Sequence, residues 1–295
     1  MSATSKKIEN QTADQVQLIS SIDRPIEEFT FLRRSLLFAE LSMVAYMHPD
    51  ECSRAAAKLG FRSGKFVNSD GAQAYVFTTE HDCVVACRGT EPNEWNDIRA
   101  DLYAVLALAE TVGRVHRGFK QEVDDLWDHL QGLLQDNSLP LWFTGHSLGG
   151  AIATISAGRC FLSHIESEPR EIYTYGSPRI GNKRYVNHVP VPLFRWVQNN
   201  DVVTRVPPSW LGYRHAGQEF YIDHQGSVVQ VYGWRRAKDR LKGFFKGLTR
   251  WRIDHFSDHL MGGYISAIDR ATRQGGDADT MPDGFTVERS NLSQP

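Results

Sequence analysis

The stretch LWFTGHSLGGAIATISAG, residues 141–158, most constrains the fold of this 295-residue chain. A hydrophobic run of strand character meets small residues of helical character, and Ser147 stands between them with Gly145 and Gly149 on either side. At so sharp a turn the residues two before and two after the serine crowd each other, so both must lack side chains. The stretch therefore predicts a strand, a tight turn that projects Ser147, and a helix packed closely on a sheet.

Short β-like runs alternate with helical patterns along most of the chain. Apolar residues recur at helical spacing in 33–47 and 121–134, and the β-like runs are AYVFTT (74–79), CVVACRG (83–89), LWFTG (141–145), EIYTYG (171–176), FRWVQN (194–199) and EFYIDHQGSVVQVYG (219–233). Strands interleaved with helices predict an α/β fold with a mostly parallel central sheet and helices on both faces. We expect this domain at residues 29–273, between a flexible N-terminal segment, 1–28, and a flexible C-terminal tail, 274–295.

Charge and cysteine content bear on partners and location. The chain has 33 basic and 35 acidic residues, so its total charge gives no reason to expect a nucleic-acid partner. Its four cysteines form no CxxC pair, and Cys83 and Cys87, on one strand, would lie beyond disulfide reach. The N-terminal residues lack the apolar core of a signal peptide, and no apolar run is long enough to span a bilayer. We therefore expect a cytoplasmic protein, in a reducing compartment and without a transmembrane segment.

Five stretches in order resemble one known family. GHSLGGA (145–151) resembles the nucleophile elbow of the class 3 lipases, a branch of the α/β-hydrolase fold that includes fungal triacylglycerol lipases. The other stretches are VVACRGTEPNEWNDIRADL (84–102), VHRGF (115–119), YTYGSPRIGN (173–182) and NNDVVTRVPP (199–208). The resemblance covers roughly residues 33–270 and implies an α/β-hydrolase fold and a serine hydrolase that cleaves esters.

The serine needs a base and an acid, because a hydroxyl is a weak nucleophile until its proton is accepted. In the α/β-hydrolase fold the acid and then the histidine follow the serine along the chain. Asp201 ends an apolar strand and falls at the position of the family's acid. His259, in an SDH segment just before a C-terminal helical pattern, matches the family's base, and His255 is its rival. His215 matches a structural segment of the family instead.

The resemblance also implies an oxyanion hole. Its backbone donors would be the N–H groups of Leu148, next after the nucleophile, and of Thr90, a residue whose hydroxyl assists in many members of the family. We interpret His116 and His146, the latter within the elbow, as positioning residues. No histidines stand at metal-ligand spacing, so we expect neither a metal nor a cofactor.

Two segments bear on the kind of ester. In the family, the region after Thr90 forms a mobile lid, here with Trp95, Asp97 and Leu102; the alternative for the apolar stretch 102–109 is a buried helix or strand. Residues 233–253 hold eight basic residues and one acidic residue, with apolar side chains at helical spacing. Such a helix would lie on an anionic membrane surface, pack on the core, or shield the site.

The resemblance and the residues together predict a lipase that acts on acylglycerol esters through Ser147, Asp201 and His259. A phospholipase A1 or a short-chain carboxylesterase would use the same three residues, with a different groove and lid. A lipase-like module that only binds lipid is the non-enzymatic alternative.

Overall fold

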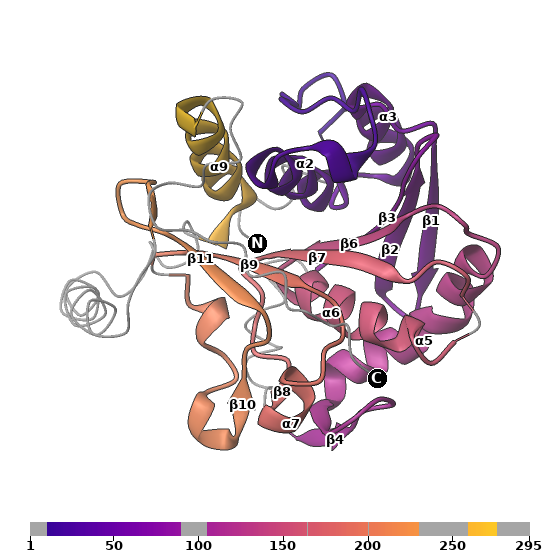
Figure 1. Ribbon diagram of the computed structural model, residues 1–295, viewed down its shortest axis with the longest axis vertical. Coiled ribbons are helices and arrows are strands. Elements are labelled where there is room, and N and C mark those ends of the chain that lie inside the picture. The colour runs from indigo at the N-terminus through magenta and orange to yellow at the C-terminus, as the bar shows by residue number, and fades with distance from the viewer. Residues whose placement is uncertain (1–10, 90–104, 164, 200, 230–258, 276–295) are drawn as a thin grey trace.

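The β-like runs of the sequence pair into one large sheet. The computed structural model describes residues 11–89, 105–163, 165–199, 201–229 and 259–275. In spatial order the strands are β1 (Ser63–Ser69), β2 (Ala72–Thr78), β3 (Cys83–Cys87), β6 (Leu141–His146), β7 (Pro169–Tyr175), β9 (Leu193–Gln198), β11 (Gln218–Ile222) and β12 (Val228–Val229) (Figure 1). Strands β3, β6, β7, β9 and β11 run parallel to one another. Strands β1, β2 and β12 are antiparallel to their neighbours. The predicted mostly parallel sheet is confirmed.

Helices cover both faces of this sheet, as the alternation of patterns predicted. One face carries α2 (Phe31–Val44), α3 (Pro49–Leu59) and α9 (Met261–Gly275), and the other carries α5 (Arg117–Leu134) and α6 (Leu148–Cys160) (Figure 1). Because side chains of a strand point alternately to opposite faces, a doubly covered strand must be apolar throughout. Strand β3, CVVAC, accordingly buries all of its residues. Within the described ranges no helix is both long and apolar enough to cross a membrane.

A second, smaller sheet lies beside the α5 and α6 face. Its strands, in spatial order, are β10 (Tyr213–Arg214), β8 (Gly181–Asn182), β5 (Arg114–His116) and β4 (Leu106–Leu108). The remaining short elements are η1 (Ile26–Glu28), α7 (Lys183–Val186), η2 (Val203–Arg205) and η3 (Ser209–Leu211). Figure 1 shows the small sheet and α7 together below the large sheet.

Helix α2 and strand β6 match in spacing along their contact. Two residues along a strand advance about 6.6 Å, and four residues along a helix advance about 6 Å, so every second residue of β6 meets every fourth residue of α2. The pairs are Phe38 with Trp142, Ser42 with Thr144, and Tyr46, two residues beyond the end of α2, with His146. The matched contact between α2 and β6 thus extends as far as His146, the residue before Ser147.

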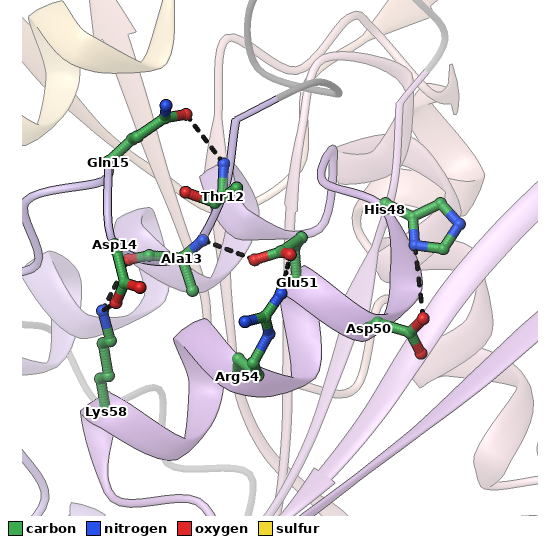
Figure 2. A network of polar contacts seen from close by, with 9 residues as sticks. All are labelled: Thr12, Ala13, Asp14, Gln15, His48, Asp50, Glu51, Arg54 and Lys58. Atoms are coloured by element: carbon green, nitrogen blue, oxygen red, sulfur yellow. Dashed lines mark hydrogen bonds and ion pairs between the residues drawn. The ribbon is translucent and has the colours of Figure 1, made fainter.

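The segment that precedes the predicted domain packs on α3. Figure 2 shows the backbone N–H of Ala13 donating to Glu51 Oε2 at 2.7 Å. In the same network, Lys58 Nζ donates to the Ala13 carbonyl at 2.8 Å and to Asp14 Oδ1 at 2.6 Å. This part of the segment thus packs against the domain, and the bounds 29–273 stay a prediction.

Two buried carboxyl groups hold the rest of this segment. Glu40, fully buried in α2, accepts from the backbone N–H groups of Ile19 and Ser20. Asp82 accepts from the N–H of Ile26 at 3.0 Å and from Trp142 Nε1 at 2.9 Å. Burial raises the pKa of both carboxyls above their ordinary values. The segment therefore satisfies polar groups of the core as well as covering it.

Candidate active site

Ser147 lies on a sharp turn between β6 and α6. Its backbone has φ 58° and ψ −130°, a conformation that L residues rarely adopt. The backbone N–H of Ser147 donates to the carbonyl of Tyr175, at the end of the neighbouring strand β7, at 2.9 Å. The serine is buried, and its Oγ has no hydrogen-bond partner within the described residues. The strained turn thus leaves the Oγ available for chemistry.

Glycines are required around this turn because backbones touch there. A methyl group at Gly145 would overlap the carbonyl of Gly149, and one at Gly149 would overlap the carbonyl oxygen of Cys87. At Gly150 the same methyl would lie 2.8 Å from the side chain of Ser177. The close contact of α6 with β3 and β6 therefore depends on Gly145 and Gly149, the two glycines that the sequence predicted.

Gly149→Ala is expected to destabilise the protein by at least about 4 kcal/mol, because the added methyl meets backbone on β3 that cannot move alone. Gly132→Ala in α5 is the matched control, since a methyl there meets nothing within 4 Å and replaces a helical glycine. The control is expected to gain up to about 1 kcal/mol. Urea unfolding measures both, and equal stabilities for the two variants would contradict the steric role of Gly149.

The expected acid and base lie against each other at the carboxyl edge of the sheet. Asp201 follows β9 and is fully buried, and its Oδ2 accepts from His259 Nδ1 at 2.9 Å. The same oxygen accepts from the hydroxyl of Tyr264 at 2.6 Å, and Oδ1 accepts from the N–H of Val203 at 2.9 Å. Three donors therefore hold the carboxyl group in one orientation.

His259 stands just before α9 and is buried. Its Nδ1–H faces the carboxyl group of Asp201, which leaves Nε2 as the nitrogen that can accept a proton. Gly176, the residue after Tyr175, has φ 61°, and a methyl there would lie 2.7 Å from Asp201 Oδ2 and 2.9 Å from the His259 ring. Ser147, bonded to Tyr175, is thus brought to the edge where the acid and the base meet.

The other histidines after Asp201 do not join this pair. His215 Nε2 lies 2.8 Å from the carbonyl of Thr204, a structural link between loops. His224 is exposed. The rival base His255 falls outside the described residues, so the choice between it and His259 rests on the hydrogen bond of His259 to Asp201.

One half of the expected oxyanion hole lies within the described structure. Leu148 is the first residue of α6, where backbone N–H groups have no partner within the helix. Gly149 lies close to Cys87 and Gly89, so this end of the helix packs against the end of β3. Gly89 is the residue that precedes Thr90. Thr90 itself lies outside the described residues, and its role stays a prediction.

The expected lid residues Trp95, Asp97 and Leu102 also lie outside the described residues. Of the apolar stretch 102–109, the described part forms β4, whose Leu108 is 71% exposed. Residues 102–104 lie outside the described residues, so the choice between a lid and a buried helix or strand stays open. The basic segment 233–253 is likewise outside the described residues.

Three contacts at this site were missed by the sequence reasoning. Tyr264 contacts the acid, Tyr46 contacts His146, and Gly176 leaves space for the acid and base. The periodic pattern in 33–47 indicated the helix that precedes Tyr46 but not what the tyrosine contacts. Gly176 lies within the stretch 173–182 that resembles the family, but the sequence assigned it no role. Nothing in the sequence indicated a role for Tyr264.

His116, at the junction of β5 and α5, is buried among aromatic rings. Its ring lies 4.2 Å from that of Phe119 and 5.9 Å from that of Tyr213. Neither ring nitrogen has a hydrogen-bond partner among the described residues, nor does the hydroxyl of Tyr213. Burial lowers the pKa of His116 from 6.5 to about 4, because the imidazolium would lose its hydration. The histidine is therefore neutral at pH 7.

This burial is expected to make folding stability fall in acid. A depressed pKa contributes stability that is fully present above pH 6.5 and is lost as pH falls toward 4, since the unfolded chain binds the proton first. The loss amounts to about 3 kcal/mol between these limits. His116→Gln should flatten the pH dependence of the free energy of unfolding in this window. An unchanged slope in the variant would contradict the assignment.

Among the described residues, no group of three or more His, Cys, Asp or Glu side chains is placed to hold a metal ion. The four cysteines are buried and free, and burial raises the pKa of the Cys83 and Cys160 thiols to about 12. Such thiols are poor nucleophiles, so the serine is the nucleophile that the site offers.

Known proteins resemble the segment that builds this site. Residues 84–210 match the sequence model of the family Lipase (class 3). The chain is 33% identical over 129 residues to a lipase of Rhizomucor miehei, which is 40% of this chain and 36% of that protein. It is 34% identical over 117 residues to the secreted mono- and diacylglycerol lipase 1 of Fusarium solani, 37% of this chain and 34% of that protein. These matches span about a third of the length of the curated relatives.

The fold agrees with a solved structure as well. A triacylglycerol lipase whose catalytic centre is a serine protease triad superposes with a TM-score of 0.53 at 26% identity, over 63% of this chain and 78% of that one. The predicted α/β-hydrolase fold is confirmed.

The prediction of a cytoplasmic protein is wrong by the same comparison, because matched lipases such as that of Fusarium solani are secreted enzymes. The unpaired cysteines misled this inference. All four are buried, and a thiol shielded from oxidants and from other thiols stays reduced in any compartment. Their free state therefore does not report on location.

Residues 84–210, which match the family model, contain the turn at Ser147 and the central strands of the large sheet that carries it. The motifs follow one another along the chain in the order that the family resemblance implies. Over that segment the chain is similar to the class 3 lipase family, a branch of the α/β-hydrolase superfamily.

Proposed function

We propose that the protein is a serine ester hydrolase of the lipase type, which cleaves the carboxylic esters of acylglycerols through Ser147, His259 and Asp201. The observation that carries this proposal is the strained turn at Ser147 beside the buried hydrogen bond between His259 and Asp201. A turn of this kind costs stability, and such strain is retained where the hydroxyl that it presents is used.

The chemistry follows from these contacts. His259 Nε2 accepts the proton of Ser147 as Oγ attacks the ester carbonyl, and Asp201 holds the imidazole in the required tautomer and stabilises its cation. The oxyanion is stabilised by the N–H of Leu148 and, as the family resemblance implies, by Thr90. Collapse of the tetrahedral intermediate expels the alcohol, which takes the proton from His259. Water then releases the acid from the acyl-enzyme by the same steps.

The test is hydrolysis of p-nitrophenyl and glycerol esters of increasing acyl length, below and above their solubility limits. A lipase is expected to prefer medium or long chains presented at an interface. Preference for short soluble esters would make the protein a carboxylesterase, and preference for phosphatidylcholine would make it a phospholipase A1. Diethyl p-nitrophenyl phosphate should abolish all activity and modify Ser147, as peptide mapping can establish; activity that survives this reagent would contradict a serine mechanism.

We also propose that residues 233–253 contact an anionic lipid surface. Their eight basic residues and their apolar side chains at helical spacing support this contact, with each basic residue adding about 1 kcal/mol. Sedimentation with vesicles measures it: binding to phosphatidylserine vesicles should exceed binding to phosphatidylcholine vesicles and weaken with salt. Replacing Arg235, Arg236 and Lys238 by Gln should reduce the difference between the two lipids, and an unchanged difference would contradict the proposal.

A further inference from the structure

A chain of hydrogen bonds links α2 to the backbone of the expected base. His146 lies on the α2 side of β6, at the end of the matched contact with that helix. Its Nδ1 lies 3.0 Å from the hydroxyl of Tyr46, and its Nε2 lies 2.7 Å from the backbone carbonyl of His259. The two partners stand 100 and 113 residues away in sequence. The side chain of His146, at the end of β6, therefore joins the residues just after α2 to the backbone of His259.

The partners determine the protonation of His146. A carbonyl oxygen only accepts, so Nε2 must carry the proton that it donates to His259. Nδ1 of the neutral ring then accepts from the hydroxyl of Tyr46. The carbonyl of His259 thus selects the tautomer, and the hydroxyl of Tyr46 stabilises it by donating to Nδ1.

His259 is in this way held at two points. Its side chain is oriented by Asp201, and its backbone is oriented by His146, the residue that directly precedes Ser147. The rings of His146 and His259 also lie side by side, 4.4 Å between centroids. We infer that His146 is a positioning residue, which sets the distance of the base from the nucleophile through the carbonyl of His259 while Tyr46 stabilises the tautomer that this contact requires.

Burial agrees with this role. His146 is buried, and desolvation, followed by the neighbouring imidazole of His259, lowers its pKa well below the ordinary value. Among the described residues, the rings that lie against it are those of Tyr46, Tyr264 and His259. A neutral ring can lie beside the imidazolium that forms on His259 during catalysis without repelling it.

The inference rests on the proposed function and is tested with two matched amides. In His146→Gln an amide nitrogen lies near the place of Nε2 and can donate to the His259 carbonyl, whereas in His146→Asn it lies near the place of Nδ1 and is too short to do so. Diethyl p-nitrophenyl phosphate counts the working serines through stoichiometric release of p-nitrophenol. Pre-steady-state acylation by p-nitrophenyl butyrate then gives the rate per working serine.

The acylation rate per working serine is expected to be about 100-fold lower in His146→Asn, because a base displaced by about 1 Å costs this much. His146→Gln should recover at least tenfold of that loss, and the substrate KM should change little in either. Equal rates in the two variants, or a loss explained wholly by fewer titrated serines, would overturn the inference. A parent protein without any titratable serine would instead overturn the proposed function.

Tyr46→Phe provides the second measurement, which does not depend on the folding of either His146 variant. The ring is retained and only the hydroxyl that donates to Nδ1 is lost, so the acylation rate per working serine should fall about tenfold at an unchanged number of working serines. A rate equal to that of the parent would overturn the assigned role of Tyr46 and with it the tautomer argument.

Discussion

Ser147→Ala is expected to lower kcat for ester hydrolysis by about 10⁶-fold. The variant keeps the turn but removes the oxygen that would form the acyl-enzyme, so no residue of the described site can replace it. Alanine is close to serine in size, and the Oγ makes no hydrogen bond within the described residues, so the free energy of unfolding should change little. Steady-state hydrolysis of p-nitrophenyl butyrate and urea unfolding measure the two effects.

The outcome separates the enzymatic reading from the non-enzymatic alternative. A lipase-like module that only binds lipid would show no activity in the parent protein and no difference in the variant. Diethyl p-nitrophenyl phosphate is first shown to inhibit the parent protein. If Ser147→Ala is then still active, the reaction takes place on another residue. Either result would reject the role assigned to Ser147.

Asp201→Asn is the second change with a large expected effect, a fall in kcat of about 10⁴-fold. When the amide oxygen keeps the bond from the Val203 N–H, the amide nitrogen takes the place of Oδ2 and donates, so His259 is driven to the tautomer with its proton on Nε2. That tautomer cannot accept the proton of Ser147. Raising the pH should not restore the rate, since the tautomer and not the charge is wrong.

Tyr264→Phe is the matched control for this change. It removes one of the three donors to the carboxyl group of Asp201 and leaves the bond to His259 in place. A fall of about tenfold is expected, as for a single hydrogen bond to a charged group. If Asp201→Asn were no more damaging than Tyr264→Phe, Asp201 would be a structural carboxyl group and not the acid of the site.

The sequence by itself determined the local parts of this protein. The strand, turn and helix around Ser147 follow from hydrophobic pattern and from glycine, and the alternation of such patterns predicted the doubly covered parallel sheet that the structure confirms. The candidates Asp201 and His259 were also reachable, because the fold places its catalytic residues in a set order along the chain. These inferences need only short windows and the order of motifs.

Contacts across the fold were decided by tertiary structure alone. No pattern predicts that Tyr46 meets His146, that His146 holds the carbonyl of His259, or that Tyr264 contacts Asp201. Each of these bonds joins residues 63 to 113 positions apart, and the register of helix against strand selects the pair. The cysteines show the same limit, since their spacing suggested a compartment while their burial explains why they are free. Local sequence specifies which elements form, and packing then determines which side chains meet, because distance in space depends on every element that lies between them.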